Sequence, residues 1–450
     1  MRVIVVGAGE VGTHLTSHLS EEGHDVVMIE IDALRAEAAD DTLNAMVING
    51  NGASSKVLDA AGAQGADMMI AVTDMDEVNI VGCVIGKTMG VGKRIARVKD
   101  TDYYSEGTGR SLREVGVDIM INPDLAAALE IERLVSLPGA SDVSDFGNAR
   151  VRMVGLYVNE SSAILGLSLN EIEKKFGRKL ATVVAIVRDE RTIIPHGDTV
   201  LETEDHVFVM GGTKAMPVIM QQLGYDVSPI KNVMIVGAGP ISRHLARHLA
   251  DDKVQVKIIE VKKEKAERTA ELLDRVMVLH GDATDADLLA AENIEEMDAI
   301  IAASNDEETN IMSCLLARHL GVKKTIALMK RSNYIPLVHA LGIDAAISVR
   351  LNTASAIMKF VRRGDIVSFA QLKENEAEAL ELVAHADTPL CKKPIQEVTI
   401  PKNAIIGAVI RGSEVLIPRG DTQIQDGDRV VVFALPKAVE AVERLFARRS

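Results

Sequence analysis

The sequence predicts an α/β protein with two Rossmann-like parallel-sheet domains, each followed by a small α+β module. Two observations predict this fold. First, a short apolar strand runs into a glycine-rich turn and a helix twice, at residues 2–12 and again at 232–242. Second, apolar strands go on alternating with helices after each turn, which is typical of a parallel sheet covered on both faces. The chain of 450 residues therefore contains the same unit twice.

The repeat extends along the whole chain in the order large, small, large, small. We expect domains at 1–135, 146–225, 231–362 and 372–450, with linkers at 136–148, 225–231 and 363–376. In the large domains, short continuous apolar runs predict strands buried on both faces, at 2–6, 68–72, 94–98, 232–236, 299–303 and 325–329. Helices at 125–134 and 353–360 should close these domains. The small modules should contain strands at 151–159, 181–187, 206–210 and 429–433 and a helix at 168–176.

The helices that follow the strands at 68–72 and 299–303 should begin at matching positions. Asp74 and Glu77 are spaced as the N-cap and N3 acid of a helix start, and so are Asn305 and Glu308. The matched cysteines Cys83 and Cys314 on these helices are expected to be core residues.

The first glycine turn predicts a nucleotide site. Gly7 allows a tight turn out of the strand, Gly9 lets the backbone approach a pyrophosphate, and Gly12 lets the helix pack close to the sheet. The N–H groups and the dipole of the helix N-terminus favour phosphate at this place. Glu30 ends the second strand, where an acid accepts hydrogen bonds from ribose hydroxyls and repels a 2′-phosphate, so NAD is favoured over NADP.

The second turn keeps this pattern with two departures. Glu260 retains the ribose-binding acid, but Ser242 stands in place of the third glycine and should widen the packing of helix on sheet. Pro240 removes one N–H near the phosphates, although proline is tolerated in the first helical turn. We expect a second nucleotide site, the alternative being a copy kept for structure alone.

Further ligand contacts should come from the carboxyl ends of the next strands, where open α/β sheets bind ligands. Arg97 could neutralise a phosphate, and because its counterpart is Leu328, the two sites should not be equivalent. The residues predicted to bind the cofactor are Gly7, Ala8, Gly9, Glu10, Val11, Gly12, Glu30, Thr73, Asp74 and Arg97 in the first copy. In the second copy they are Gly237, Ala238, Gly239, Pro240, Ile241, Glu260, Ser304 and Asn305.

Composition excludes several classes of partner. Aromatic residues make up 3% of the chain and tryptophan is absent, which argues against a stacking surface for nucleic acid or sugars. The net charge of −15 argues against nucleic acid and anionic lipid. No apolar run approaches the roughly 20 residues that span a bilayer, and the three cysteines show no CxxC spacing. These features indicate a soluble cytoplasmic protein.

No catalytic or metal site is predicted. The sequence shows no nucleophile–base pair and no zinc motif. His14 and His18, like His244 and His248, have metal-ligand spacing, but no acid or cysteine completes either set, so we expect ordinary boundary histidines. His196 is matched in the repeat by an arginine, which disfavours a shared catalytic role.

The motifs resemble those of RCK domains, the regulators of potassium conductance. The segments GAGEVGTHL (7–15), NGNGASSKVLDAAGAQGADMMIAVTDMDEVNI (49–80) and RIARVKDTDY (94–103) resemble the nucleotide-binding unit of these domains. The segments GLSLNEIEKKFG (166–177) and IIPHGDTVLETEDHVFVMG (193–211) resemble the C-terminal RCK module. The tandem arrangement in one chain is similar to the TrkA family, the cytoplasmic regulatory subunits of bacterial Trk potassium uptake systems.

The resemblance implies a regulator rather than an enzyme. It implies binding of NAD or NADH, and in some members ATP or ADP, at the residues named above. It also implies a ring, formed as a homotetramer with eight units, on the inner face of the cell membrane beneath an integral membrane potassium-translocating subunit of the TrkH/TrkG type. Two alternatives stay open, an NAD-dependent oxidoreductase on a duplicated scaffold and a scaffold that binds no nucleotide. The C-terminal modules could bind a second effector or dimerise.

Overall fold

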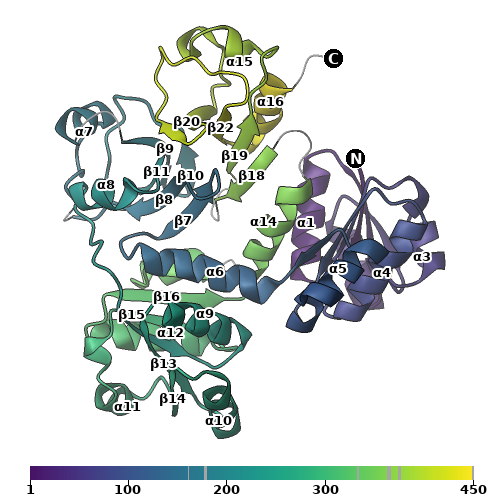
Figure 1. Ribbon diagram of the computed structural model, residues 1–450, viewed down its shortest axis with the longest axis horizontal. Coiled ribbons are helices and arrows are strands. Elements are labelled where there is room, and N and C mark those ends of the chain that lie inside the picture. Colours follow the sequence, from purple (N-terminus) through teal and green to yellow (C-terminus); the bar gives the residue numbers. More distant parts are fainter. Residues whose placement is uncertain (161, 177–179, 332–333, 362–365, 373–376, 448–450) are drawn as a thin grey trace. The chain divides into compact units, whose positions relative to one another are not determined.

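The computed structural model describes residues 1–450 apart from 161, 177–179, 332–333, 362–365, 373–376 and 448–450 (Figure 1). Its described residues fall into two compact units. The first unit consists of Met1–Ala127 and Ser348–Val361, and the second of Ala128–Ile347 and Arg362–Ser450. No helix in these described ranges is both long and apolar enough to cross a membrane.

The first unit is built on a parallel sheet of order β3-β2-β1-β4-β5-β6. The strands are β1 (Arg2–Val6), β2 (Asp25–Glu30), β3 (Met46–Asn49), β4 (Met68–Ala71), β5 (Lys93–Arg97) and β6 (Ile119–Ile121). The helices are α1 (Glu10–Glu21), α2 (Ala33–Thr42), α3 (Ser55–Ala60), α4 (Asp76–Thr88), α5 (Glu106–Val115) and α14 (Val349–Val361). Figure 1 shows α1 and α14 on one side of the sheet and α3, α4 and α5 on the other.

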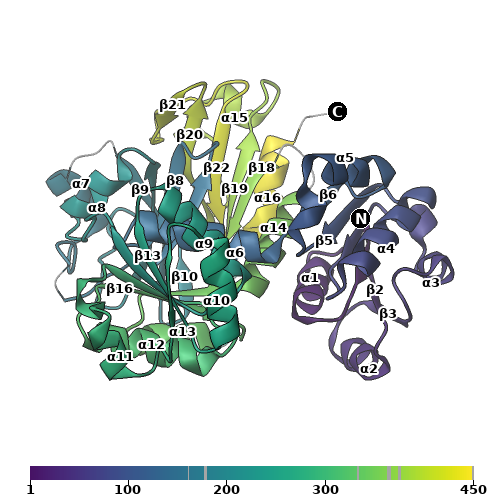
Figure 2. The same ribbon diagram turned by 60° about the horizontal axis from the view of Figure 1, so that its bottom comes forward.

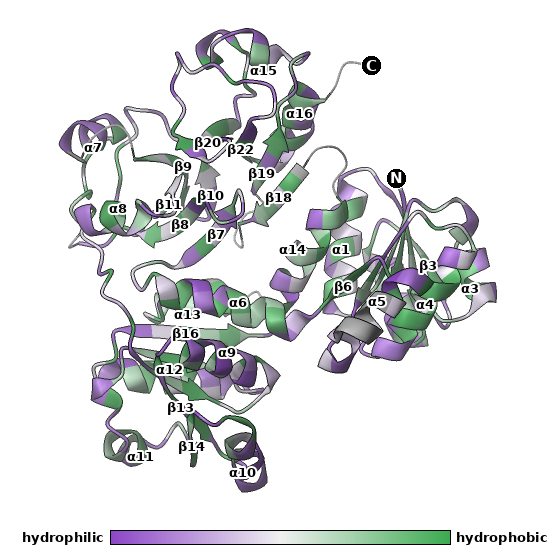
Figure 3. Cartoon of the chain, viewed as in Figure 1, coloured by the Kyte–Doolittle hydropathy of each residue, from purple (hydrophilic) through white to green (hydrophobic). Residues whose placement is uncertain are grey.

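The core of this unit lies between the sheet and its helices. Ile4, Ile29 and Met69 come from the central strands and are fully buried. Cys83 on α4 packs into the same cluster. The strand residues are hydrophobic on both faces, which Figure 3 shows in green, because helices cover both sides of the sheet. The prediction of a doubly covered parallel sheet is confirmed.

The second unit contains a parallel sheet with the corresponding order, β14-β13-β12-β15-β16-β17. The strands are β12 (Asn232–Val236), β13 (Gln255–Glu260), β14 (Met277–His280), β15 (Ala299–Ala302), β16 (Lys324–Met329) and β17 (Ala345–Ser348). The helices are α9 (Pro240–Asp251), α10 (Lys263–Leu272), α11 (Ala286–Ala291), α12 (Glu307–His319) and α13 (Ile335–Ala340). Figure 2 shows strands β13 and β16 together with helices α9 to α13.

The same unit holds two antiparallel modules, of order β10-β9-β11-β8-β7 and β18-β19-β22-β20-β21. The first comprises β7 (Asp142–Phe146), β8 (Val151–Tyr157), α7 (Leu169–Phe176), β9 (Ala181–Arg188), β10 (Arg191–Ile193), β11 (His206–Gly212) and α8 (Met216–Gln222). The second comprises β18 (Ile366–Gln371), β19 (Glu378–Val383), α15 (Pro389–Lys392), β20 (Ala404–Arg411), β21 (Glu414–Leu416), β22 (Arg429–Ala434) and α16 (Pro436–Phe446).

The two antiparallel modules share one hydrophobic core. Phe146 and Phe208 of the first module belong to the same buried cluster as Phe433 of the second. A hydrogen bond of 2.9 Å from the Gly147 amide to Glu381 Oε2 also joins them. The two antiparallel modules therefore pack against each other within one chain.

Two expected linkers contain strands. β7 lies in 136–148 and β18 lies in 363–376, and each pairs antiparallel with the next strand of its module. The sheets of the modules therefore start before the expected boundaries at 146 and 372. In β7 only Val143 and Phe146 are buried, so this edge strand reads as polar in the sequence.

The helices that follow the last strand of each parallel sheet, α6 (Pro123–Ser136) and α14, occur where the repeat predicts them, but they do not belong to the expected compact units. α14 belongs to the first unit, where the Lys93 ammonium donates to the Phe360 carbonyl at 3.1 Å. Residues 128–136 of α6 belong to the second unit, where Glu132 lies 3.3 Å from His248 Nδ1. Each parallel sheet is thus grouped with the closing helix of the other repeat.

The predicted helix caps are wrong. The N-cap of α4 is Met75 rather than Asp74. The N-cap of α12 is Asp306 rather than Asn305, and its carboxylate accepts the Thr309 amide at 2.8 Å. Both helices therefore start one residue later than predicted.

Candidate nucleotide sites

The first glycine turn has the geometry that its sequence requires. Gly7 has a φ of +106°, and a Cβ added there would lie 3.1 Å from the Thr73 nitrogen. At Gly12 an added Cβ would lie 1.8 Å from the Gly7 carbonyl oxygen, so only glycine fits against the turn. Around Gly9, apart from its chain neighbours, no atom of the described residues lies within 4 Å of an added Cβ. The turn therefore leaves open space directly before the N-terminus of α1.

Glu30 is a buried residue that holds this turn in place. The residue is 6% exposed, and Oε2 accepts the Ala8 amide at 2.6 Å while Oε1 accepts the Asp32 amide at 2.9 Å. The carboxylate thus ties the glycine turn to the start of α2. Each carboxylate oxygen has a further lone pair, so acceptance of a ribose hydroxyl stays a prediction.

The other predicted residues of the first turn lie around the N-terminus of α1. Ala8 donates its amide to Glu30, Glu10 is the first residue of α1 and is exposed, and Val11 is half-buried. Backbone N–H groups at such a helix start are free to bind an anion. The structure brings these residues together with the end of β2 as expected.

Asn79, which was not among the predicted site residues, holds the neighbouring strand ends together. It is fully buried on α4, and its Oδ1 accepts the Thr73 amide at 2.9 Å and the Thr73 hydroxyl at 2.7 Å. Its Nδ2 donates to the carbonyls of Thr73 and Arg97 at 3.0 and 2.8 Å. An asparagine at a buried helix position in both repeats is the signal that could have identified it.

Arg97 lies at the site but is already engaged. Its Nη1 is 3.0 Å from Asp74 Oδ1 and 3.3 Å from the Thr73 carbonyl oxygen. The Arg97 side chain is 14% exposed and that of Asp74 is 80% exposed. The pair places a cation beside the end of β5, and the carboxylate that partners it is exposed.

The second turn repeats this construction. Gly237 has a φ of +86°, and Glu260 accepts the Ala238 amide at 2.8 Å and the Lys262 amide at 3.0 Å. Pro240 starts α9, and Ile241 behind it is buried. As in the first copy, the side chain of an asparagine on the following helix bonds to the backbone at the ends of the two neighbouring strands.

In this copy the asparagine is Asn310. Its Oδ1 accepts the Ser304 amide at 2.9 Å, and its Nδ2 donates to the carbonyls of Ser304 and Leu328 at 3.2 and 2.9 Å. Leu328 is buried and replaces the cation of the first copy. Lys330 donates to the Asn305 carbonyl instead.

Two side chains distinguish the second site from the first. Ser242 is fully buried, and among the residues that the structure describes its hydroxyl has no hydrogen-bond partner. Lys265 Nζ lies 2.8 Å from Glu260 Oε2. Burial acts to raise the pKa of Glu260, but the Lys265 ammonium and the N–H groups that the carboxylate accepts outweigh burial and hold this pKa below its ordinary value.

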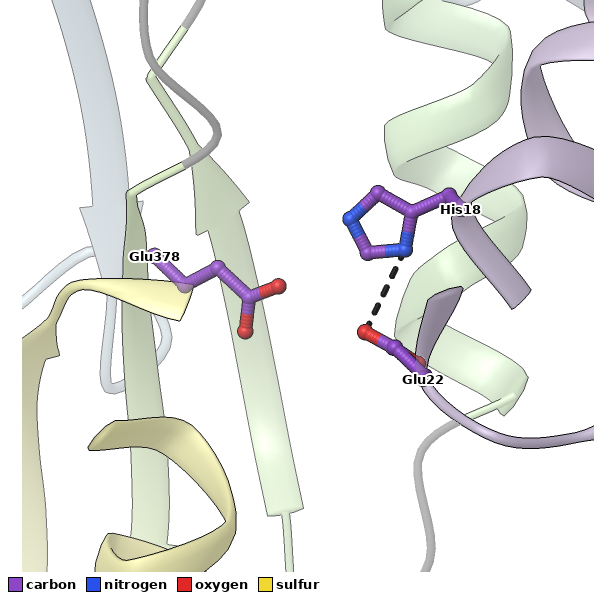
Figure 4. A group of neighbouring side chains, drawn as sticks. All are labelled: His18, Glu22 and Glu378. Atoms are coloured by element: carbon purple, nitrogen blue, oxygen red, sulfur yellow. Dashed lines mark ion pairs between the residues drawn. The ribbon is translucent and has the colours of Figure 1, made fainter. Parts of the chain in front are cut away.

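The histidines of α1 have an acidic neighbour that the sequence analysis did not find. His18 Nδ1 lies 3.2 Å from Glu22 Oε1, one helical turn away, as Figure 4 shows. His14 does not join this pair in a cationic form, because burial, with Arg350 and His18 adding to it, lowers its pKa to about 4. The expectation that no acid accompanies these histidines is therefore wrong for His18.

Comparison with known proteins matches both halves of the chain to the same two domain models. The TrkA-N domain matches residues 3–123 and 233–349, and the TrkA-C domain matches 153–224 and 379–447. The chain belongs to the TrkA family. It is 38% identical to the Trk system potassium uptake protein TrkA homolog 1 of Methanosarcina mazei, over 99% of this chain and 100% of that protein. It is also 38% identical to the Trk system potassium uptake protein TrkA of Halomonas elongata, over 99% and 98%.

Solved structures confirm the fold of this TrkA family member. The GsuK RCK domain matches with a TM-score of 0.61 at 18% identity, covering 100% of this chain and 95% of that chain. The GsuK channel bound to NAD also gives 0.61 at 18% identity, covering 100% and 79%. The tandem RCK architecture that the motifs predict is therefore confirmed.

Proposed function

We propose that this protein is a nucleotide-sensing regulatory subunit of a potassium uptake system. The observation that carries the proposal is the duplicated turn, in which open space before a helix N-terminus adjoins a buried acid, Glu30 or Glu260. Family members similar over their full length are named as Trk potassium uptake proteins, which supports potassium transport as the process that is regulated.

The ligand that we propose for the turns is NAD or NADH, with ATP or ADP as competing nucleotides. The diphosphate would lie against the helix N-terminus beside Gly9 or Gly239, where the dipole and free N–H groups favour it. Structures of the GsuK channel, which shares the fold, are bound to NAD in one case and to ADP in another.

The mechanism that we propose is allosteric. A nucleotide that contacts the glycine turn and the strand ends held by Asn79 or Asn310 favours one arrangement of the domains over another. Such coupling is worth about 1–3 kcal/mol per site. Four chains in a ring would supply eight sites, enough to exceed the roughly 5.5 kcal/mol that moves a gate from mostly closed to mostly open.

In this proposal the protein is cytoplasmic, lies on the inner face of the cell membrane, and acts on an integral membrane potassium-translocating subunit. It binds nucleotide without turning it over. The competing function, an NAD-dependent oxidoreductase, rests on the glycine turns alone. It predicts loss of NADH absorbance with an aldehyde or oxidation of a hydroxy acid, and turnover of either kind would favour it over the regulator.

Potassium uptake in cells that lack this protein tests the proposal. Deletion should reduce uptake, and expression of the wild-type chain should restore it. The double variant Gly9→Asp, Gly239→Asp should fold but fail to restore nucleotide-dependent uptake, since both turns then repel phosphate. Unchanged uptake after deletion, or full rescue by the double variant, would refute the proposal.

A further inference from the structure

The acid that ends the second strand is followed by opposite charges in the two repeats. Two residues after Glu30 lies Asp32, whose carboxylate caps α2 by accepting the Arg35 amide at 2.9 Å. Two residues after Glu260 lies Lys262, and in the described part of the chain its side chain makes no cap to α10. The first site therefore presents two carboxylates where the second presents one carboxylate and an ammonium.

The N-terminus of helix α10 carries three lysines together with one acid, Glu264. Lys262, Lys263 and Lys265 lie at or within its first turn, at the positive end of the helix dipole, where cations are unfavourable. Figure 3 shows α10 as a hydrophilic helix. The second repeat thus lacks the carboxylate cap that Asp32 gives to α2 and keeps one acid, Glu264, in the first turn. Sequences break such local rules mainly at functional sites.

The lysine nearest the site neutralises its acid directly. Lys265 Nζ lies 2.8 Å from Glu260 Oε2, the same oxygen that accepts the Ala238 amide of the glycine turn. The Glu260 side chain is 5% exposed, whereas that of Lys265 is 39% exposed, so the ammonium can also reach a ligand. At the corresponding position of the first copy Arg35 is exposed, and Glu30 accepts backbone amides.

We propose that the second site selects a dinucleotide with a 2′-phosphate on its adenosine ribose, NADP or NADPH, while the first site selects NAD or NADH. This inference rests on the proposed function, because it takes both turns to hold the diphosphate of a dinucleotide. In a Rossmann domain the acid at the end of the second strand faces the 2′ position of the ribose, and a cation there accommodates a phosphate. Asp32 beside Glu30 repels that phosphate, whereas Lys262 at the same position attracts it and Lys265 offsets the charge of Glu260.

ATP differs from NADPH in where its charge lies. Its phosphates are all attached at the 5′ position, and they would meet the glycine turn rather than the first turn of α10. Substitution of Lys262 should therefore weaken the binding of NADPH far more than that of ATP. This difference separates selection of a 2′-phosphate from a general attraction of anions.

Calorimetric titration of the full chain carrying Gly9→Asp, which blocks the first turn, tests the inference. NADPH should bind the remaining site about tenfold or more tighter than NADH, the effect of about one close, partly exposed charge pair. Lys262→Asp, which restores the residue of the first repeat, should abolish the preference, and Lys265→Ala should reduce it. Lys253→Asp is the control, because it makes the same charge change just before the first residue of β13, at the end of the strand away from Glu260. It should leave the preference for NADPH intact.

The reciprocal substitution, Asp32→Lys in the first repeat, tests the inference without changing α10. In a chain whose second turn is blocked by Gly239→Asp, Asp32→Lys should shift the first site from NADH toward NADPH. Equal affinity for the two dinucleotides in the Gly9→Asp chain, or an unchanged ratio after Lys262→Asp, overturns the inference and leaves the proposed function standing. Absence of any nucleotide binding to the wild-type chain overturns the proposed function itself.

Discussion

Substitution of Gly9 by aspartate should separate nucleotide binding from folding. Gly9 is the N-cap of α1 and has φ −73° and ψ 178°, an extended conformation that any residue adopts. An added Cβ meets no described atom within 4 Å beyond its chain neighbours. Gly239 is equivalent, with φ −69° and ψ 177° and its nearest such atom 4.0 Å away. The side chain would enter the space proposed for the diphosphate.

The substitution should raise the stability of the fold and lower the affinity for nucleotide. Aspartate is a better N-cap than glycine by a few tenths of a kcal/mol, and a carboxylate at the positive end of a helix adds about 0.3–1 kcal/mol. The same charge about 4 Å from a phosphate costs about 4 kcal/mol at an effective dielectric constant of 20. Halving this for the water in an open site leaves about 2 kcal/mol, or roughly thirtyfold weaker binding.

Calorimetric titration with NADH, together with thermal unfolding, measures both consequences. Gly9→Asp should lose binding at one site and melt no lower than the wild type. Gly65→Asp is the matched control, since an added Cβ there also meets no described atom beyond its neighbours within 4 Å and the residue lies outside the turn. A folded Gly9→Asp chain that binds NADH at both sites with wild-type affinity would refute the reasoning, as would equal loss of binding in the control.

Three further predictions concern buried groups. Asn79→Ala should lower the free energy of unfolding by about 2–4 kcal/mol in urea, because it leaves buried backbone groups unpaired at two strand ends, and a loss below about 0.5 kcal/mol would contradict the role assigned to this side chain. Burial raises the pKa of Cys83 and of Cys314 to about 12. A thiol reagent at neutral pH should therefore label only Cys391 in the native protein and all three thiols in denaturant. Fast labelling of Cys83 or Cys314 in the native protein would contradict their assignment to the core. Burial lowers the pKa of Lys324 from 10.5 to about 8, so its charged form destabilises the fold below pH 8. The free energy of unfolding should therefore rise by about 3 kcal/mol as the pH increases from 8 to 10.5. The variant Lys324→Met should lack that rise in denaturant titrations at several pH values, and an identical pH profile would contradict it.

The fold class and most strands were predictable because their determinants are local. The strand at 2–6 and its copy at 232–236 are observed at these residues, since each is a continuous apolar run that ends at a glycine. The edge strand β7 was missed because it buries only two side chains. The helix caps were assigned wrongly because the spacing of Asp74 and Glu77 alone does not reveal that Thr73 bonds to Asn79 and that Met75 is the N-cap of α4.

The sequence predicted the position of the glycine turns but not the hydrogen bonds and ion pairs that the site residues make. The glycine turn follows from steric limits on single residues, such as the absence of room for a Cβ at Gly12. The engagement of Glu30 by the Ala8 amide, and the pairing of Glu260 with Lys265, depend on where folded strands bring side chains. No spacing rule in the sequence distinguishes a free acid from a paired one.

The sequence by itself determined the duplication, the alternation of strands and helices, and the two glycine turns, because each depends on hydrophobic periodicity or on the backbone freedom of single residues. Only the tertiary structure decided which parts pack together. α14 belongs with the first parallel sheet although it follows the second, and the cores of the two antiparallel modules merge around Phe146 and Phe433. These contacts join residues more than 200 positions apart, and their partners are selected by complementary buried surfaces that form only when the chain has folded.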